Sequence, residues 1–263
     1  MSFRVATLNI WNRMGPWDDR LVAILAGVEK IQPDILGLQE VIVLPGAFDQ
    51  AAIIAEKFGM KSFFGQNDGS EYPMGNAILS KWPIRKTAVF PLPRVDTDEH
   101  RSLVFAEVEA PHGVVPVFCT HLNWKLHEGH VREVQMRFVT DKIRELAPIS
   151  GLPPVLVGDM NAEPDSDEMR FLRGLTKLGG DSVYFADCFG IAGDGTAGFT
   201  YSRKNPYAAP LREPSRRIDF IYVRGPDEQG RGEPLDASVC FDEPVNDVFA
   251  SDHFGVVANI STE

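Results

Sequence analysis

The chain has 263 residues and a formal net charge of −11, from 26 Lys and Arg against 37 Asp and Glu. This charge argues against a surface built to bind long stretches of nucleic acid, because neutralising a phosphate backbone requires a basic footprint. The apolar share of 44% is ordinary for a soluble globular protein and sufficient for a sizeable core. The 3 cysteines are widely spaced and form no C-x-x-C pair, which argues against a disulfide framework or a zinc site.

The sequence contains no apolar run of about 18 residues, and a strand-like run follows Met1 almost directly, without the features of a leader. We therefore expect a cytoplasmic protein without a transmembrane segment. No repeat or linker interrupts the chain, and the candidate site residues described below are spread over its whole length. We expect a single catalytic domain over residues 1–263.

The predicted elements alternate between strands and helices along the chain. Strands are expected at residues 3–10, 35–40, 76–80, 102–110, 114–120, 155–159, 217–221, 237–242 and 254–260. Helices are expected at residues 21–31, 48–58, 128–146 and 166–175, the last with Ser166 as its cap, and a polar loop at residues 65–75. This mixture predicts an α+β fold.

Several of these strand-like runs end in polar side chains. Glu40, His121, Asp159 and Asp219 stand at such ends, and the run Ser251-Asp252-His253 directly precedes the last strand. Ionisable groups beside buried strands need partners or a metal to offset the cost of desolvation. Together these residues supply oxygen ligands, a base and imidazoles, a set that suits metal-assisted hydrolysis of a phosphate ester.

Each of these features also has a simpler interpretation. Asp and Asn at a strand end often only make turn hydrogen bonds, and a lone histidine often makes a structural one. The sequence Gly193-Asp194-Gly195-Thr196-Ala197-Gly198 matches G-x-G-x-x-G, but no helix follows, which favours a flexible loop over a dinucleotide site.

Residues 203–217 carry a local positive charge that is opposite in sign to the whole chain. Five Lys and Arg residues in this segment face one acidic residue, Glu213. The excess indicates anion steering near the strand that carries Asp219, with an ordinary solvated loop as the alternative. We predict substrate binding by Arg203 and Lys204 of this segment and by Tyr201 just before it. Separately, Arg101, which precedes the strand at residues 102–110, is predicted as an anion clamp, because an Arg beside a phosphate site can bind the anion.

In chain order, a set of short motifs resembles the endonuclease/exonuclease/phosphatase superfamily, which includes DNase I-like nucleases, sphingomyelinases, inositol-phosphate phosphatases and deadenylases. The motifs are Leu8-Asn9, Gln39-Glu40, Thr120-His121-Leu122-Asn123, Gly158-Asp159-Met160-Asn161, Ile218-Asp219 and Ser251-Asp252-His253. The resemblance covers nearly the whole chain. It implies a four-layer αββα sandwich, in which helices flank two packed, mainly antiparallel sheets.

The resemblance also implies roles for individual residues. The implied catalytic residues are His121, Asp159, Asn161, Asp219 and His253. The implied metal site consists of Glu40, Asn9 and Asp252, and Asn123 is added to the substrate-binding residues. Because Mg²⁺ prefers oxygen ligands and is commonly held by one or two carboxylates, we expect Mg²⁺ at this site, with Mn²⁺ as a substitute.

These inferences predict a Mg²⁺-dependent phosphodiesterase or phosphatase. Its expected substrate is small or flexible, such as a nucleotide, short oligonucleotide, sugar phosphate or lipid headgroup, and no extended duplex-binding surface is evident. The alternatives are a DNA endonuclease or exonuclease, for which only residues 203–217 offer a basic track, and a non-catalytic binding protein on the same scaffold.

Overall fold

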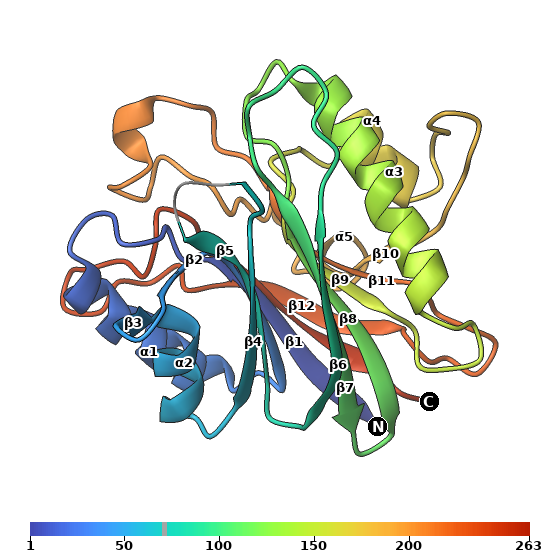
Figure 1. The fold of residues 1–263 in the computed structure, drawn as a ribbon, viewed down its shortest axis with the longest axis horizontal. Helices are drawn as coiled ribbons and strands as arrows, with labels where there is room; N and C mark the ends of the chain where they lie inside the picture. Colours follow the sequence, from blue (N-terminus) through green and yellow to red (C-terminus); the bar gives the residue numbers. More distant parts are fainter. Residues whose placement is uncertain (70–72) are drawn as a thin grey trace.

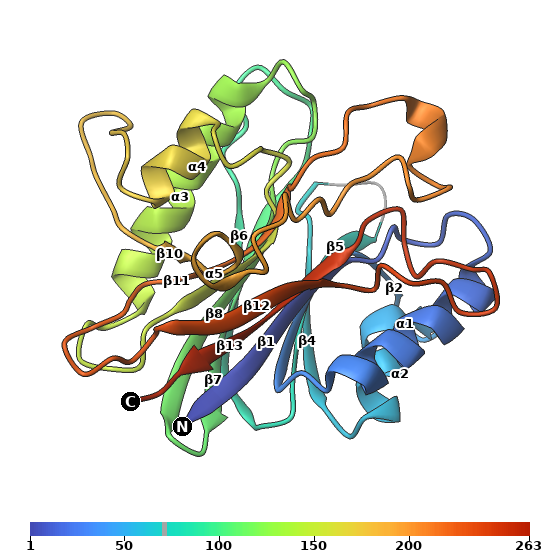
Figure 2. The same cartoon turned by 180° about the vertical axis from the view of Figure 1, so that it is seen from behind.

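The computed structural model describes residues 1–69 and 73–263, so residues 70–72 of the predicted polar loop lie outside the described part. Two β-sheets pack face to face, with helices on their outer faces (Figures 1 and 2). In the first sheet the order is β12 (Pro234–Cys240), β13 (Gly255–Ser261), β1 (Ser2–Asn9), β2 (Ile35–Leu44), β5 (Met74–Ser80) and β4 (Lys61–Gln66), and β3 (Phe48–Asp49) pairs with β2. In the second the order is β10 (Ala186–Asp187), β11 (Asp219–Val223), β9 (Val155–Asp159), β8 (Gly113–His121), β7 (Ser102–Ala110) and β6 (Ile84–Pro91).

Helices cover the two outer faces of this sandwich (Figure 1). Helices α1 (Trp17–Ile31) and α2 (Gln50–Lys57) lie on the first sheet, and α3 (Gly129–Leu146) and α4 (Asp167–Leu172) lie on the second. The short helix α5 (Cys188–Ala192) contacts β11 and β12, and a 3₁₀ turn spans Ala209–Leu211. Among the residues that the structure describes, none of the helices combines the length and apolar character needed to cross a membrane.

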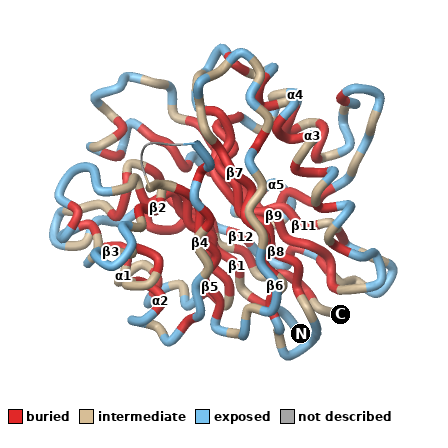
Figure 3. Tube along the Cα trace, in the orientation of Figure 1, coloured by how far each residue is buried: buried red, intermediate tan, exposed pale blue. Residues whose placement is uncertain are grey.

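Three apolar layers hold these elements together. The central layer lies between the sheets, and Val5, Ile78, Val117 and Val157 are fully buried in it. The outer layers join each sheet to its helices, and Ile24 of α1 is fully buried in one of them. The interior strands are therefore buried on both faces, while edge strands such as β6 and many residues of the helices remain exposed (Figure 3). The predicted α+β sandwich with flanking helices is confirmed.

The structure corrects several predicted boundaries. The strand expected to end at residue 40 continues to Leu44, and α4 ends earlier than predicted, at Leu172. Ser166 precedes α4 as predicted, but its hydroxyl donates to the Glu163 carbonyl and does not cap the helix. Strands β4 and β6 were not predicted, because they lie at sheet edges, where exposed polar residues weaken the apolar pattern.

Strand direction brings the polar strand ends to one side of the sandwich. Strands β1 and β2 are parallel, as are β8 and β9, so Asn9, His121 and Asp159 all lie at carboxyl ends of strands. Asp219 stands at the start of its strand, not at the end as predicted. Because β11 runs antiparallel to β9, Asp219 nevertheless pairs directly with Asp159. Both chain termini lie on the opposite side of the molecule (Figures 1 and 2).

Candidate active site

Asp159 lies at the centre of the polar cluster between the two sheets. Its Oδ2 accepts a hydrogen bond from Asn9 Nδ2 at 3.0 Å, and its Oδ1 accepts one from the Asn161 amide at 2.9 Å. The same Oδ2 lies 3.4 Å from His121 Nε2 and 3.7 Å from His253 Nε2. Burial, followed by the negative charge of Asp219, raises the pKa of Asp159 to about 7. A carboxylate with such a pKa can exchange a proton near neutral pH.

The backbone conformation on either side of Asp159 determines where its side chain lies. Gly158 has a φ of +151°, and a Cβ there would lie 1.9 Å from the Thr120 carbonyl oxygen of the neighbouring strand. Glycine therefore permits the close approach of β8 and β9 that sets His121 beside Asp159. Asn161, with a φ of 50°, then turns the chain back, and its side chain donates to the Leu122 carbonyl.

His253 is held by a buried carboxylate. Its Nδ1 lies 2.9 Å from Asp219 Oδ2, and both residues are buried. Burial alone would lower the pKa of His253, but the charges of Asp219, Asp159 and Asp252 raise it well above the usual value. Asp219 is itself fixed by its own backbone amide, which donates to Thr200 Oγ1 at 3.1 Å. The pairing with Asp219 therefore favours the charged form of His253.

His121 has a very different partner. Its Nδ1 lies 3.0 Å from Arg101 Nη1, and Arg101 Nη2 lies 3.3 Å from Glu99. Burial, together with the positive charges of Arg101 and His253, lowers the pKa of His121 well below its usual value. Arg101, predicted as an anion clamp, is thus part of the cluster. It contacts His121, which is one of the predicted catalytic residues.

Glu40 is aimed into the site by an irregularity in β2. The pairing of β2 with β5 shifts register between Leu38 and Val41, and Glu40 adopts a left-handed φ of 59°. Such bulges redirect side chains and often occur beside active sites. Asn9 Nδ2 donates to Glu40 Oε1 at 3.1 Å and Asn12 Nδ2 donates to Oε2 at 2.9 Å. Two amides thus orient this carboxylate.

The sequence predicts Asn9 as a metal ligand, and the structure shows how its side chain is oriented. Its Oδ1 accepts the Trp11 backbone amide at 2.9 Å, which orients Nδ2 toward Glu40 and Asp159. An amide nitrogen does not bind a metal ion, so Asn9 in this arrangement links the two carboxylates.

The remaining donor set fits a hard cation. Glu40 and Asp252 interact electrostatically, and burial together with Glu40 raises the pKa of Asp252 to about 6, while His253 opposes the shift. Two carboxylates that repel each other suit a divalent ion with oxygen ligands, such as Mg²⁺. Ligand atoms of Asp159, Asp219 and His253 also lie within 4.8 Å of one another. In this cluster, His253 Nδ1 is already engaged by Asp219 Oδ2, at 2.9 Å.

Arg20 and Asn12 support the site and were not among the predicted residues. Arg20 is fully buried in α1, and its guanidinium donates to five carbonyl oxygens of the two loops that flank Glu40 and Asp252. These belong to Ile10, Trp11, Asn12, Met14 and Ala250. A charged residue at helical spacing among buried apolar neighbours was the signal in the sequence that could have revealed Arg20.

The predicted substrate-binding residues fall into different places. Tyr201 is buried with its ring 5.1 Å from the His253 ring, so it belongs to the cluster. Asn123 is also buried, and its side chain donates to Thr97 Oγ1 at 3.1 Å. Arg203 donates to the Arg212 and Glu213 carbonyls of its own loop. Lys204 is exposed and lines a cavity together with Phe199, Phe249 and Phe254.

The positive excess of residues 203–217 is smaller in the structure than in the sequence. Arg217 makes a buried two-pronged ion pair with Asp187, at 2.9 and 2.8 Å, and Arg216 pairs with Glu213. The Arg217–Asp187 pair fixes the loop to strand β10 of the second sheet, whereas the Arg216–Glu213 pair lies within the loop. The cations left for anion steering are therefore Arg203, Lys204 and Arg212.

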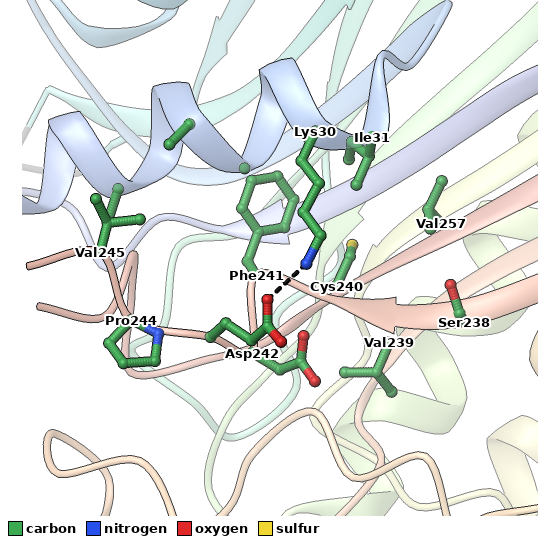
Figure 4. Close-up of a pocket in the computed structure, with 14 residues that line it drawn as sticks. Lys30, Ile31, Ser238, Val239, Cys240, Phe241, Asp242, Pro244, Val245 and Val257 are labelled. Carbon is green, nitrogen blue, oxygen red and sulfur yellow. Dashed lines mark hydrogen bonds and ion pairs between the residues drawn. The ribbon is translucent and has the colours of Figure 1, made fainter. Parts of the chain in front are cut away.

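A separate cavity of about 250 Å³ lies between α1 and residues 238–245 (Figure 4). The Phe241 ring packs beneath the helix, where a Cβ on Gly27 would lie 2.2 Å from it. Lys30 and Glu243, which both line this cavity, form an ion pair. The lining contains none of the predicted site residues, so we do not assign the chemistry to this cavity.

Comparison with solved structures finds similar folds over nearly the whole chain. TDP2 from C. elegans superposes with a TM-score of 0.76 at 23% identity, over 99% of this chain and 75% of that one. TDP2 from D. rerio complexed with a single-strand DNA product gives 0.79 at 20% identity, over 99% of both chains. The human Nocturnin catalytic domain with a bound sulfate anion gives 0.73 at 18% identity, over 99% of this chain and 93% of that one.

At these identities the structural likeness shows the fold alone. A search of the curated proteins finds no match to the sequence. The sequence model of the Endonuclease/Exonuclease/phosphatase family, however, matches residues 6–253, a span that includes the polar cluster from Asn9 to His253. The chain therefore belongs to the endonuclease/exonuclease/phosphatase family.

Proposed function

We propose that the chain is a metal-dependent hydrolase of phosphate esters, a phosphodiesterase or phosphatase that acts on a small or flexible substrate. The observation that carries this proposal is the position of Asp159, which lies between two imidazoles and is linked through Asn9 to Glu40. Residues from both halves of the chain meet there, and we therefore also propose that residues 1–263 act as one catalytic domain.

The metal site in this proposal consists of Glu40 and Asp252, with Mg²⁺ as the expected ion and Mn²⁺ as a substitute. A bound divalent ion supplies positive charge that offsets the negative charge on the phosphate oxygens. Asn9 and Asn12 orient Glu40 by donating to its two oxygens. Arg20 fixes the loops on either side, and its buried charge lowers the repulsion between these carboxylates.

Asp159 is the proposed base. A raised pKa of about 7 suits the removal of a proton from an attacking water near neutral pH. The Asn161 amide fixes Oδ1 of Asp159 and Asn9 Nδ2 donates to Oδ2, so the reacting water is proposed to approach Oδ2 beside the Asn9 amide. Asn161 is therefore proposed to position the base, and Asn123 to help bind the substrate.

His253 is the proposed cationic contact to the substrate. Its Nδ1 proton is held by Asp219, so its Nε2–H is directed toward Asp159 and the space above it. An imidazolium at this position stabilises charge that develops on the phosphate oxygens. Tyr201 packs edge-on against the ring and keeps it in this orientation.

The net charge of −11 favours a small or flexible substrate over a long duplex. Nucleotides, short oligonucleotides, sugar phosphates and lipid headgroups all satisfy this condition. A nuclease acting on DNA ends is the second candidate, because the solved structure of D. rerio TDP2 holds a single-strand DNA product on the same fold.

The proposal is tested with purified protein and a panel of phosphate mono- and diesters, including nucleotides, sugar phosphates, sphingomyelin and short single-stranded DNA and RNA. With Mg²⁺ or Mn²⁺ present, we expect turnover of at least one class. Turnover of DNA that falls steeply with added salt would favour the nuclease, because such a slope reports phosphate contacts. A folded protein that hydrolyses none of these compounds would instead be a binding protein.

Replacing Arg203 and Lys204 together by Ala is expected to raise KM more than it lowers kcat. These exposed cations lie outside the cluster around Asp159, so they would contribute binding that is equal in the ground and transition states. Steady-state kinetics on the best substrate of the panel measures both constants. The double variant Arg85→Ala/Lys86→Ala is a matched control, because it removes an exposed Arg–Lys pair from edge strand β6. Equal KM values for the two double variants would make residues 203–204 an ordinary loop.

A further inference from the structure

We propose that Arg101 is a positioning residue that holds His121 as a neutral imidazole with its single proton on Nε2. His121 would then act on a substrate only as a hydrogen-bond donor, a role that rests on the proposed function. The protonation state itself follows from the contacts of Arg101, whatever the substrate.

The direction of the Arg101–His121 hydrogen bond determines the tautomer. A guanidinium group has only N–H donors and cannot accept a hydrogen bond. The 3.0 Å contact between Arg101 Nη1 and His121 Nδ1 therefore requires a lone pair on Nδ1. A neutral imidazole with an unprotonated Nδ1 carries its proton on Nε2. The doubly protonated ring would place two N–H groups against each other.

The groups that face His121 favour the same state. Arg101 approaches from the segment before β7, and His253 from the loop before β13, and both bring positive charge. Asp159, at the end of β9, is the one carboxylate in direct contact among the described residues, and its Oδ2 lies 3.4 Å from Nε2. Glu99 forms an ion pair with Arg101, with its Oε2 at 3.3 Å from Arg101 Nη2. His121 is only 4% exposed, so little solvent screens these charges.

His253 shows the opposite arrangement within the same site. Its Nδ1 faces the carboxylate of Asp219, which accepts a proton and favours the charged ring. Both histidines direct Nε2 toward Asp159 Oδ2, at 3.4 and 3.7 Å. An N–H donor, Arg101, faces Nδ1 of one ring, and a carboxylate, Asp219, faces Nδ1 of the other, so the two rings differ in whether Nδ1 carries a proton.

This difference assigns the two rings different tasks in phosphate ester hydrolysis. A neutral Nε2–H can donate to a phosphate oxygen, but it cannot accept a proton from water at that nitrogen. His121 is thereby excluded as a competing base beside Asp159.

Nuclear magnetic resonance of the full-length protein tests the assignment directly. Long-range ¹H–¹⁵N correlation spectra distinguish a protonated from an unprotonated ring nitrogen, and His121→Gln and His253→Gln identify the two signals. Between pH 6 and 8, with and without Mg²⁺, we expect His121 to show a protonated Nε2 and an unprotonated Nδ1. A doubly protonated His121, or a proton on Nδ1, would overturn the proposal without any variant of Arg101.

The role of Arg101 is tested with Arg101→Met and Arg101→Lys in the same spectra. The Met variant removes the donor and the charge, so we expect the titration of His121 to shift to higher pH. The Lys variant retains both and is expected to keep the proton on Nε2. Arg94→Met is the matched control, because Arg94 makes the same kind of contact with the half-buried His100, at 3.2 Å, and its loss should leave His121 unchanged. An unchanged His121 in Arg101→Met would remove Arg101 from this role.

The outcome for Arg101 and the outcome for the proposed function can be told apart. The spectra need no substrate, so they remain informative even when no phosphate ester is hydrolysed. Conversely, turnover with a doubly protonated His121 would support the enzyme and reject the assignment. If Arg101→Met does not fold, Arg101→Gln, which keeps a neutral donor, tests whether the hydrogen bond alone holds the tautomer.

Discussion

Replacing Asp159 by Asn is expected to lower kcat by about 10² to 10⁴, the usual effect of losing a general base. The substitution keeps the volume of the side chain but removes the group that can accept a proton. The Asn161 amide can still donate to Oδ1, as it does in the native protein. In the variant, however, the new Nδ2 faces Asn9 Nδ2, the amide nitrogen that donates to Asp159 Oδ2 in the native protein. Steady-state kinetics on the best substrate measures the loss.

Thermal unfolding of the metal-free variant separates this loss from misfolding. The pKa of Asp159 in the folded protein is raised by burial and Asp219 to about 7, from an ordinary value of 3.8. As the pH rises, Asp159 keeps its proton in the folded protein at pH values where it has already lost the proton in the unfolded chain. The contribution of the group to stability is therefore complete below pH 3.8 and is lost as the pH rises through 7. Asn has no such dependence.

The Tm of Asp159→Asn relative to wild type should consequently rise between pH 4 and pH 8 when both are measured in EDTA. Asp165→Asn is the matched control, because Asp165 follows in the same loop and its side chain is 97% exposed. Its activity and its Tm should match wild type. A folded Asp159→Asn variant with near-normal turnover would place the base elsewhere.

The sequence predicts most of the fold because the interior strands carry uninterrupted apolar runs. Val155 to Val157 are fully buried on both faces, and such runs are visible without any structure. Strands β4 and β6 were missed for the opposite reason, since they are edge strands with exposed positions such as Lys61 and Lys86. Edge strands owe their conformation to pairing with a neighbour, and a single sequence does not contain that information.

The members of the site could be predicted better than their roles. Polar residues at strand ends mark Glu40, His121 and Asp159, because a buried strand rarely ends in such groups by packing alone. The roles depend on hydrogen-bond direction and on the charge of distant neighbours. Asn9 looked like a ligand until the Trp11 amide fixed its orientation, and the bulge that aims Glu40 leaves no mark in the sequence.

Chelation of divalent metal with EDTA is expected to abolish turnover, and added Mg²⁺ or Mn²⁺ to restore it. Glu40 and Asp252 offer only oxygen atoms, which favours hard cations over zinc. Their mutual repulsion, one cause of the raised pKa of Asp252, should also make the metal-free protein less stable than the loaded one. Titration with Mg²⁺ followed by thermal unfolding measures this gain without any substrate.

Glu40→Gln provides the variant that locates the ion. It keeps the shape of the side chain, but it removes one of the two charges that would hold the metal. We expect a higher Mg²⁺ requirement for turnover and a smaller rise of Tm with Mg²⁺ than in wild type. Glu56→Gln, an exposed substitution on α2, should change neither. If fully demetallated protein retained its rate, the hydrolysis would have to proceed on the charges of His253 and Arg101 alone, and Glu40 would be left as a partner of Asn9 and Asn12.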